Sequence, residues 1–236
     1  MSDQIERRDF IQGATVVAGV AAAAVGFTDH PAFAQTGAKP MTYDPKPMSF
    51  DPKAIKGISE KVLVSHYENN YVGAVKRLNA IGAQLADLDF GKAPNFVING
   101  LKREELIAAN SMILHEVYFN SIGAPNRPGD ALAKAIERDF GSDARWRAEF
   151  SAYGKALGGG SGWVVLVYSH HEHRLMHHWA ADHTMNLAWS SPLLALDMYE
   201  HAYAIDYGAR AAGYVDAVMA TLNWKFADGL YARASA

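Results

Sequence analysis

Apolar residues in the first half of the chain recur at helical spacing in two long stretches. The first continues from Ser59, a residue type that favours the helix N-cap, with a bend expected near Gly73. The second is predicted from about Arg103 to Asn120, after a loop over 87–100 that contains two glycines and a proline. Two long helices joined by one loop predict an antiparallel helical hairpin.

The hydrophobic pattern changes after a linker over 123–130, which is dense in turn-forming residues. Short apolar runs then replace the long helical repeats, as is typical of strands between shorter helices. The pattern predicts helices over 130–139, 142–155, 212–222 and 225–234, and strands over 163–168, 174–181 and 193–198. We therefore predict an α+β protein. A helical hairpin domain with an extended N-terminal arm (35–125) precedes an α/β domain with a small three-stranded antiparallel sheet (126–236).

The first 34 residues are typical of an export signal. Arg7 and Arg8 form a twin-arginine pair, an apolar stretch covers 13–27, and Ala32-Phe33-Ala34 is a small-x-small cleavage site. The apolar stretch is too short for a comfortable membrane span, so no stable membrane insertion of the mature protein is expected. These features predict passage through the twin-arginine export machinery, cleavage after about Ala34 and a periplasmic location. A buried N-terminal helix or a retained anchor is the alternative.

Composition limits the chemistry that the chain can perform. The 236 residues carry a formal net charge of -3, with no broad basic field that would hold nucleic acid. The absence of cysteine excludes disulfides, thiolate metal ligands and cysteine nucleophiles. Any metal must therefore bind to nitrogen and oxygen ligands, which the ten histidines can help to supply.

A carboxylate and an imidazole stand four residues apart in Asp197-Met-Tyr-Glu-His201. They can meet at one ion where a strand end runs into the start of a helix. His66 and His115, on the two predicted long helices, can complete a set that suits iron, manganese or zinc. Spacing alone leaves the alternative open that these are ordinary core or surface residues.

Several stretches resemble, in order, the iron/manganese superoxide dismutases: Ile58–Tyr67 with Leu78-Asn79, His115 with Tyr118-Phe119, Gly160–Trp163, Leu196–Tyr203, and Asn223-Trp224. The resemblance runs from about Phe50 to Ala234. It implies that His66, His115, Asp197 and His201 bind one iron or manganese ion per subunit, with solvent as a fifth ligand. The implied activity converts superoxide to dioxygen and hydrogen peroxide.

The same resemblance implies roles for residues around the ligands. His183 would act in catalysis as the hydrogen-bond partner of the metal-bound solvent, because Ser111, at the alternative position, has too short a side chain. Trp163 would form an apolar wall beside the metal. Glu200 would reach the metal-bound histidine of a partner subunit in a homodimer, with Tyr203 close by.

Three positions depart from the family pattern. Asn70 stands where a histidine is usual, and Ala74 and Ala204 stand where tyrosines are usual. These three positions belong to the substrate gate of the family and to its link with the partner subunit. We therefore expect a wider substrate channel, which admits larger anions, and slower proton delivery. The alternative function is a periplasmic metal-binding protein of the same fold, with weak dismutase activity or altered redox activity toward small anions.

Histidines also gather outside this site, at His170, His171 and His173 and in the pair His177-His178. Residues in a predicted turn are usually solvated, and a surface site for a divalent metal is the alternative. Strand alternation predicts that one of His177 and His178 points inward.

Overall fold

The computed structural model describes residues 39–236, so the predicted export signal lies outside the described part. The first elements of the described part are the helices η1 (Pro52–Ala54), α1 (Glu60–Ser65), the π-helical turn η2 (His66–Tyr71), α2 (Val72–Ala86), α3 (Asn95–Ser121), α4 (Asp130–Phe140) and α5 (Asp143–Ala156). Strands β1 (Trp163–Ser169), β2 (Arg174–Ala180) and β3 (Ser190–Asp197) follow, then η3 (Glu200–Ala202), α6 (Ala204–Tyr207), α7 (Ala211–Ala220) and α8 (Lys225–Ala234). No helix among these described residues is long and apolar enough to cross a membrane.

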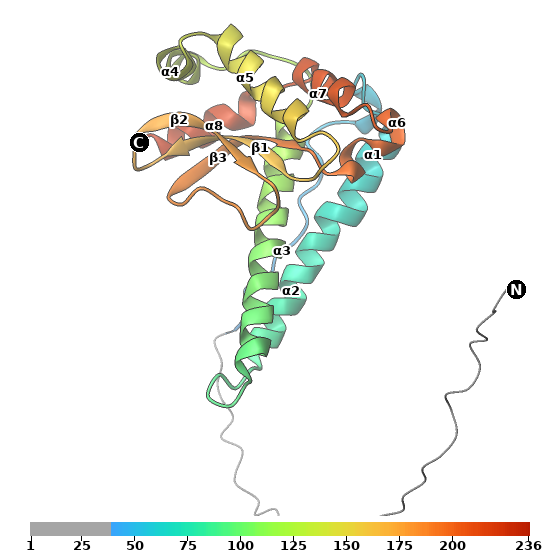
Figure 1. The fold of residues 1–236 in the computed structure, drawn as a ribbon, viewed down its shortest axis with the longest axis vertical. Coiled ribbons are helices and arrows are strands. Elements are labelled where there is room, and N and C mark those ends of the chain that lie inside the picture. Colours follow the sequence, from blue (N-terminus) through green and yellow to red (C-terminus); the bar gives the residue numbers. More distant parts are fainter. Residues whose placement is uncertain (1–38) are drawn as a thin grey trace, which may run out of the picture. The chain divides into compact units, whose positions relative to one another are not determined.

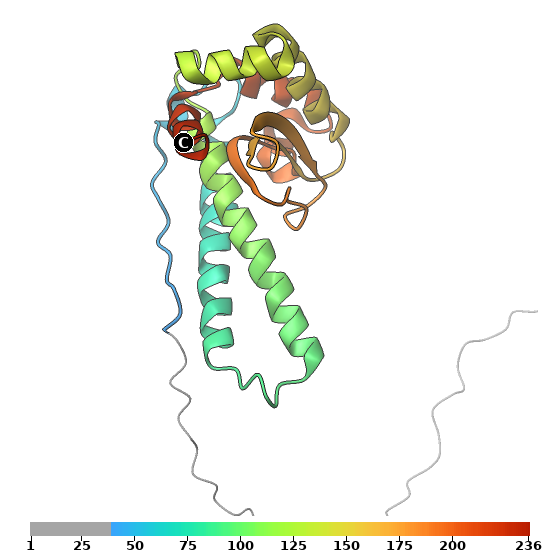
Figure 2. The same ribbon diagram turned by 90° about the vertical axis from the view of Figure 1, so that its left-hand side faces the viewer.

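The predicted helical hairpin is confirmed: α2 and α3 contact each other, and they diverge toward the loop that joins them (Figures 1 and 2). The Ser59 side chain caps α1 by accepting a hydrogen bond from the backbone of Val62 at 3.2 Å. A bend was predicted near Gly73; what the structure has in this stretch is the π-helical turn η2, which begins at His66 and ends at Tyr71. Such turns often occur at functional sites.

The predicted loop over 87–100 is wrong at its end, because α3 begins at Asn95. Pro94 has the extended backbone of an N-cap and starts the helix, since a proline is tolerated where no helical N–H bond is required. Gly100 then lies inside the helix, where its cost of up to about 1 kcal/mol is offset by the packing of a long element. The result is a helix two turns longer than the sequence pattern indicated.

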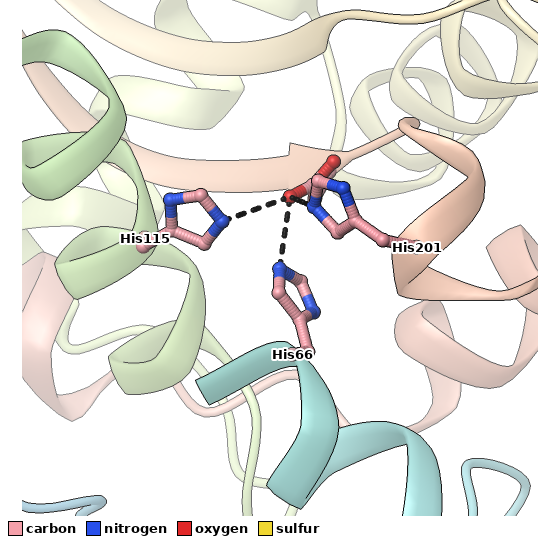
Figure 3. Close-up of side chains that lie close together, drawn as sticks. His66, His115 and His201 are labelled. Atoms are coloured by element: carbon pink, nitrogen blue, oxygen red, sulfur yellow. Dashed lines mark hydrogen bonds and ion pairs between the residues drawn. The ribbon is translucent and has the colours of Figure 1, made fainter. Parts of the chain in front are cut away.

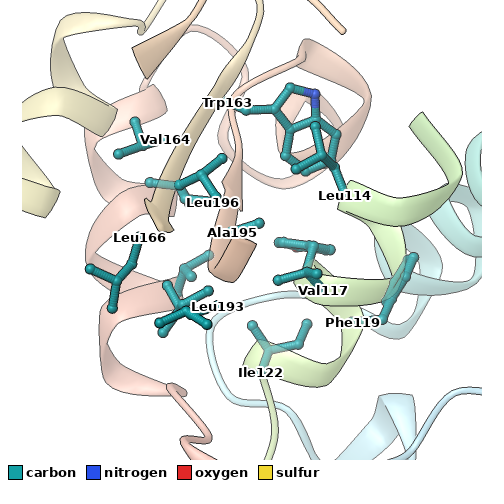
Figure 4. Close-up of a cluster of buried hydrophobic side chains, with 14 of the residues drawn as sticks. Leu114, Val117, Phe119, Ile122, Trp163, Val164, Leu166, Leu193, Ala195 and Leu196 are labelled. Carbon is teal, nitrogen blue, oxygen red and sulfur yellow. The ribbon is translucent and has the colours of Figure 1, made fainter. Parts of the chain in front are cut away.

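The three predicted strands form one antiparallel sheet in the order β2-β1-β3, which confirms the predicted fold class. Every residue of the central strand β1 is buried. This explains why β1 is a continuous apolar run rather than an alternating one. Helix α3 packs on one face of β3, and Leu114, Val117 and Ile122 belong to the buried cluster there (Figure 4).

The strand register determines where the polar end of the sheet lies. Trp163, the first residue of β1, pairs with Asp197, the last residue of β3. Both side chains face α3, because the Trp163 ring lies 5.2 Å from the His115 ring, between centroids, and Oδ2 of Asp197 lies 3.5 Å from Nε2 of His115. The sheet thus brings one carboxylate and one indole to the face covered by α3.

Gly162 forms a tight corner just before β1 and supports this end of the sheet. Its φ is +128°, and its carbonyl accepts a hydrogen bond from the Met198 backbone at 2.9 Å. A Cβ at this position would overlap the carbonyl oxygen of Ala180. We expect Gly162→Ala to lower the free energy of unfolding by at least about 2 kcal/mol, measured by urea denaturation.

Gly100→Ala is the matched control, because a Cβ there meets no atom within 4 Å and the residue is helical. It should raise stability by about 0.5–1 kcal/mol. Equal stability of the Gly162→Ala protein and the wild type would show that the corner has no such constraint.

The expected inward-facing histidine of β2 is His177, whose side chain is only 3 % exposed. Its ring lies 4.5 Å from the ring of Phe140, between centroids, and its Nδ1 is 3.6 Å from the Glu149 carboxylate. Burial lowers the pKa of His177 to about 4. The imidazole is therefore neutral in the folded protein at neutral pH.

This burial makes stability depend on pH. As pH falls below about 6.5, His177 takes up a proton in the unfolded chain before it does so in the folded one. Its contribution is complete above pH 6.5 and is lost as pH falls toward 4, at a total cost of up to about 3 kcal/mol. His177→Phe should flatten the fall in unfolding free energy over this range in denaturant titrations, whereas the exposed His171→Phe should leave the fall unchanged.

Candidate metal centre

The structure brings together the four residues that the sequence singled out as metal ligands. His66 opens η2, His115 lies on α3, Asp197 ends β3 and His201 lies in η3 (Figure 3). One oxygen of Asp197, Oδ2, lies 3.1 Å from Nε2 of His66, 3.5 Å from Nε2 of His115 and 3.1 Å from Nε2 of His201. Three segments far apart in the sequence, one of which carries both Asp197 and His201, therefore direct four donor atoms to a common point.

The geometry and chemistry of these donors fit a first-row metal ion. The four donor atoms all lie within 4.8 Å of one another. Two ligands of one ion, each bonded at about 2.1 Å, lie roughly 3 to 4 Å apart, so only small shifts would admit the ion. Nε2 of His115 is buried and has no hydrogen-bond partner among the described residues. Buried polar atoms normally have a partner, and a metal ion would provide one. Three imidazoles and one carboxylate suit iron, manganese or zinc.

Burial favours the neutral imidazole of two of the candidate ligands, His66 and His115. It lowers the pKa of His66, and together with the neighbouring His66 it lowers the pKa of His115 to about 3. Burial alone would raise the pKa of Asp197, but the charge and hydrogen bond of His201 and the hydrogen bond of His66 outweigh it and lower that pKa. Neutral imidazoles beside an ionised carboxylate are the protonation states that bind a metal.

Ser111 orients one of the imidazoles, a contact that the sequence analysis did not predict. Nδ1 of His115 donates to the Ser111 carbonyl at 2.6 Å, one helical turn earlier, which directs Nε2 toward the other donors. The i, i+4 spacing on one helix could have indicated it. The Ser111 hydroxyl stays within the helix, 3.3 Å from the same Nδ1.

Trp163 and His183 lie beside the four residues. The buried Trp163 ring is 5.2 Å from the His115 ring and 5.7 Å from the His183 ring, between centroids. His183 follows β2 in a turn, and its Nε2 is buried without a partner in the described part of the chain. Burial lowers the pKa of His183 as well. Both side chains therefore lie next to the four candidate ligands.

The other three residues named from the sequence lie farther from the donor atoms. Tyr203 is buried and stacks on Tyr214 at 5.4 Å between ring centroids. Glu200 is exposed at the start of η3. Asn70 is half-buried in η2, and within residues 39–236 its side chain forms no hydrogen bond. None of them contacts the four ligand candidates directly within this chain by a hydrogen bond or ion pair.

Ala74 and Ala204, where the resemblance to the family implies tyrosines, carry only methyl side chains. Ala74 is buried in α2, and Ala204 is exposed at the start of α6. Tyr71, the next tyrosine in this region, has its hydroxyl occupied by the Lys46 backbone at 2.8 Å and the Glu116 carboxylate at 3.1 Å. Its hydroxyl is thus directed to the N-terminal arm and α3.

One family model and three relatives show what this chain is similar to. Residues 128–229 match the family described as iron/manganese superoxide dismutases, C-terminal domain. A protein of Cupriavidus metallidurans named superoxide dismutase [Fe] is 61% identical over 194 residues, which cover 82% of this chain and 98% of that protein. Superoxide dismutase [Mn] 1 of Halobacterium salinarum is 34% identical, with 71% and 83% covered, and superoxide dismutase [Fe] of Aquifex pyrophilus is 32% identical, with 76% and 87% covered.

The fold and the group of three histidines and one aspartate define a protein with a candidate metal centre of nitrogen and oxygen donors. The chain belongs to the iron/manganese superoxide dismutase family.

Proposed function

We propose that this protein is a superoxide dismutase that binds one iron or manganese ion per subunit at His66, His115, Asp197 and His201. The observation that carries the proposal is the convergence of these four donor atoms within 4.8 Å, in a chain 61% identical to an iron superoxide dismutase. Relatives named for iron and for manganese both match, so either metal fits the proposal.

An iron or manganese ion held by His66, His115, Asp197 and His201 would supply one-electron redox chemistry, by which two superoxide ions and two protons become one dioxygen and one hydrogen peroxide. The protein residues have the remaining tasks. One carboxylate among three neutral imidazoles gives the ligand set a charge of only -1, so the loaded site stays positive and attracts an anion. His201, with 26% of its side chain exposed, is the most open of the four and marks the side of approach.

His183 is the residue that we propose for proton handling and for tuning the metal. Its unpartnered Nε2 is available to bond solvent beside the metal, and Trp163 excludes bulk water on the same side. We expect His183→Ala to retain the metal but to shift its reduction potential.

Separate loading with iron and manganese, followed by assays of superoxide removal, tests the proposed function. We expect catalytic removal with at least one of the two metals at full occupancy. Full occupancy without removal by either metal would refute it and would leave the second candidate, a metal-binding protein of the same fold with weak dismutase activity or altered activity toward small anions.

The altered gate is the observation that favours this second candidate. Asn70, Ala74 and Ala204 together remove two hydroxyls and one imidazole from the family pattern. If the proton path depends on them, turnover should fall at high pH. Pulse radiolysis across pH separates the cases, because an unchanged, fast rate over the whole range excludes slowed proton delivery.

We also propose export through the twin-arginine machinery to the periplasm, with cleavage after about Ala34, and assembly as a homodimer. Arg7-Arg8 and the small-x-small sequence support export, and about a fifth of this chain lies outside a match that covers 98% of its relative.

The exposed Glu200 supports the dimer, since it is free to face a partner subunit. N-terminal sequencing of protein from its host tests the first proposal, and the mass in solution of wild type and Glu200→Ala tests the second.

A further inference from the structure

Tyr199 holds three parts of the metal centre together, although the sequence analysis gave it no role. Its hydroxyl lies 2.8 Å from Nδ1 of His183. Its ring stacks on His201 with 5.4 Å between centroids and 12° between planes. Its backbone N–H donates to Oδ1 of Asp197 at 2.8 Å. The same residue thus contacts two proposed ligands and the proposed proton-handling histidine.

The hydroxyl contact matters because the two ring nitrogens of a neutral imidazole are not equivalent. One carries a proton and donates, and the other has a lone pair and accepts. A tyrosine hydroxyl that donates to Nδ1 requires the proton of His183 to be on Nε2. Nε2 is the buried nitrogen without a partner, and it is the atom left to meet the solvent beside the metal.

We propose that Tyr199 is a positioning residue of the metal centre, whose hydroxyl donates to Nδ1 of His183 and keeps His183 in the tautomer that presents Nε2–H to the metal-bound solvent. This inference rests on the proposed metal centre.

The stacking on His201 fixes the angle at which Tyr199 can reach His183. Since Asp197 and His201 flank Tyr199 two residues away on each side, the turn that places the ligands also places the hydroxyl. A phenylalanine would keep the stack and the backbone bond and would remove the hydroxyl, and with it the contact to Nδ1. Tyr199→Phe is therefore a selective test of the hydroxyl.

Nitrogen NMR of histidine side chains in the full chain reports the tautomer directly, both metal-free and loaded with diamagnetic zinc. We expect His183 to be unprotonated at Nδ1 in the wild type and to become a mixture of tautomers in Tyr199→Phe. Tyr168→Phe, at the opposite end of β1 from Trp163, is the matched control and should leave the His183 signals unchanged. A wild-type His183 with its proton on Nδ1, or identical His183 signals in Tyr199→Phe, would overturn the proposal.

Activity of the loaded protein adds a second readout. Tyr199→Phe should lower turnover about tenfold at unchanged metal content, as is typical when the partner of a metal-site residue is lost. In a His183→Gln background the same change should have no further effect, because the amide has no tautomer to select. An equal loss in both backgrounds would show that Tyr199 does not act through His183. The NMR result stands even if neither metal supports dismutation, so the two proposals fail separately.

Discussion

His201→Ala should reduce the iron or manganese content of the purified protein to background and lower superoxide removal by at least roughly a hundredfold. The estimate follows because loss of a residue that only supports a metal ligand already costs about 10–100-fold. The side chain of His201 is 26% exposed, whereas those of the other three candidates are at most 1% exposed. Its removal therefore opens a small, solvent-connected space rather than a buried cavity, and the fold should persist.

The matched control is His171→Ala, which removes an exposed histidine of the β1–β2 turn. It should keep both metal and activity. Metal content by elemental analysis and thermal unfolding of each variant separate loss of the ligand from loss of the fold. If folded His201→Ala retained a full complement of metal, the four-residue centre would be wrong.

Trp163→Ala should lower the free energy of unfolding by about 3–5 kcal/mol and weaken metal binding in the molecules that remain folded. Trp163 is fully buried, and its ring forms edge contacts with His115 and His183. Its loss leaves a cavity beside one proposed ligand and the proposed proton-handling residue. Without the indole, the imidazoles of His115 and His183 can move more. Metal binding must then restrict this motion, which costs free energy and weakens the affinity.

Trp146→Ala provides a control of equal size. Trp146 is also fully buried, but it packs on Phe150 and Trp224. We expect a similar loss of stability with an unchanged metal affinity, measured by metal titration under conditions where both variants are folded. Equal affinities in the two variants would show that Trp163 is ordinary core.

Much of the fold followed from hydrophobic periodicity, because long amphipathic helices and a strand buried on both faces have distinct patterns. The pattern was misleading at α3, where Pro94 and Gly100 suggested a loop although the first can start a helix and the second is tolerated within one. The π-helical turn at His66 has no period of its own, so the sequence indicated only some irregularity nearby.

The residues of the metal centre were harder to predict from the sequence than the helices and strands. Asp197 and His201 are close in the sequence, but His66 and His115 meet them only through packing of α3 on the sheet and the hairpin contact between α2 and α3. Resemblance to a family supplied that link. The Tyr199 contact with His183 joins residues 16 positions apart through two turns, and no sequence period encodes it.

The product stoichiometry of superoxide removal by the fully metal-loaded protein tests the central claim most directly. Dismutation predicts one dioxygen and one hydrogen peroxide for every two superoxide ions, over many turnovers and without an added reductant. No catalytic removal at full metal occupancy, or peroxide formed without dioxygen, would contradict the claim.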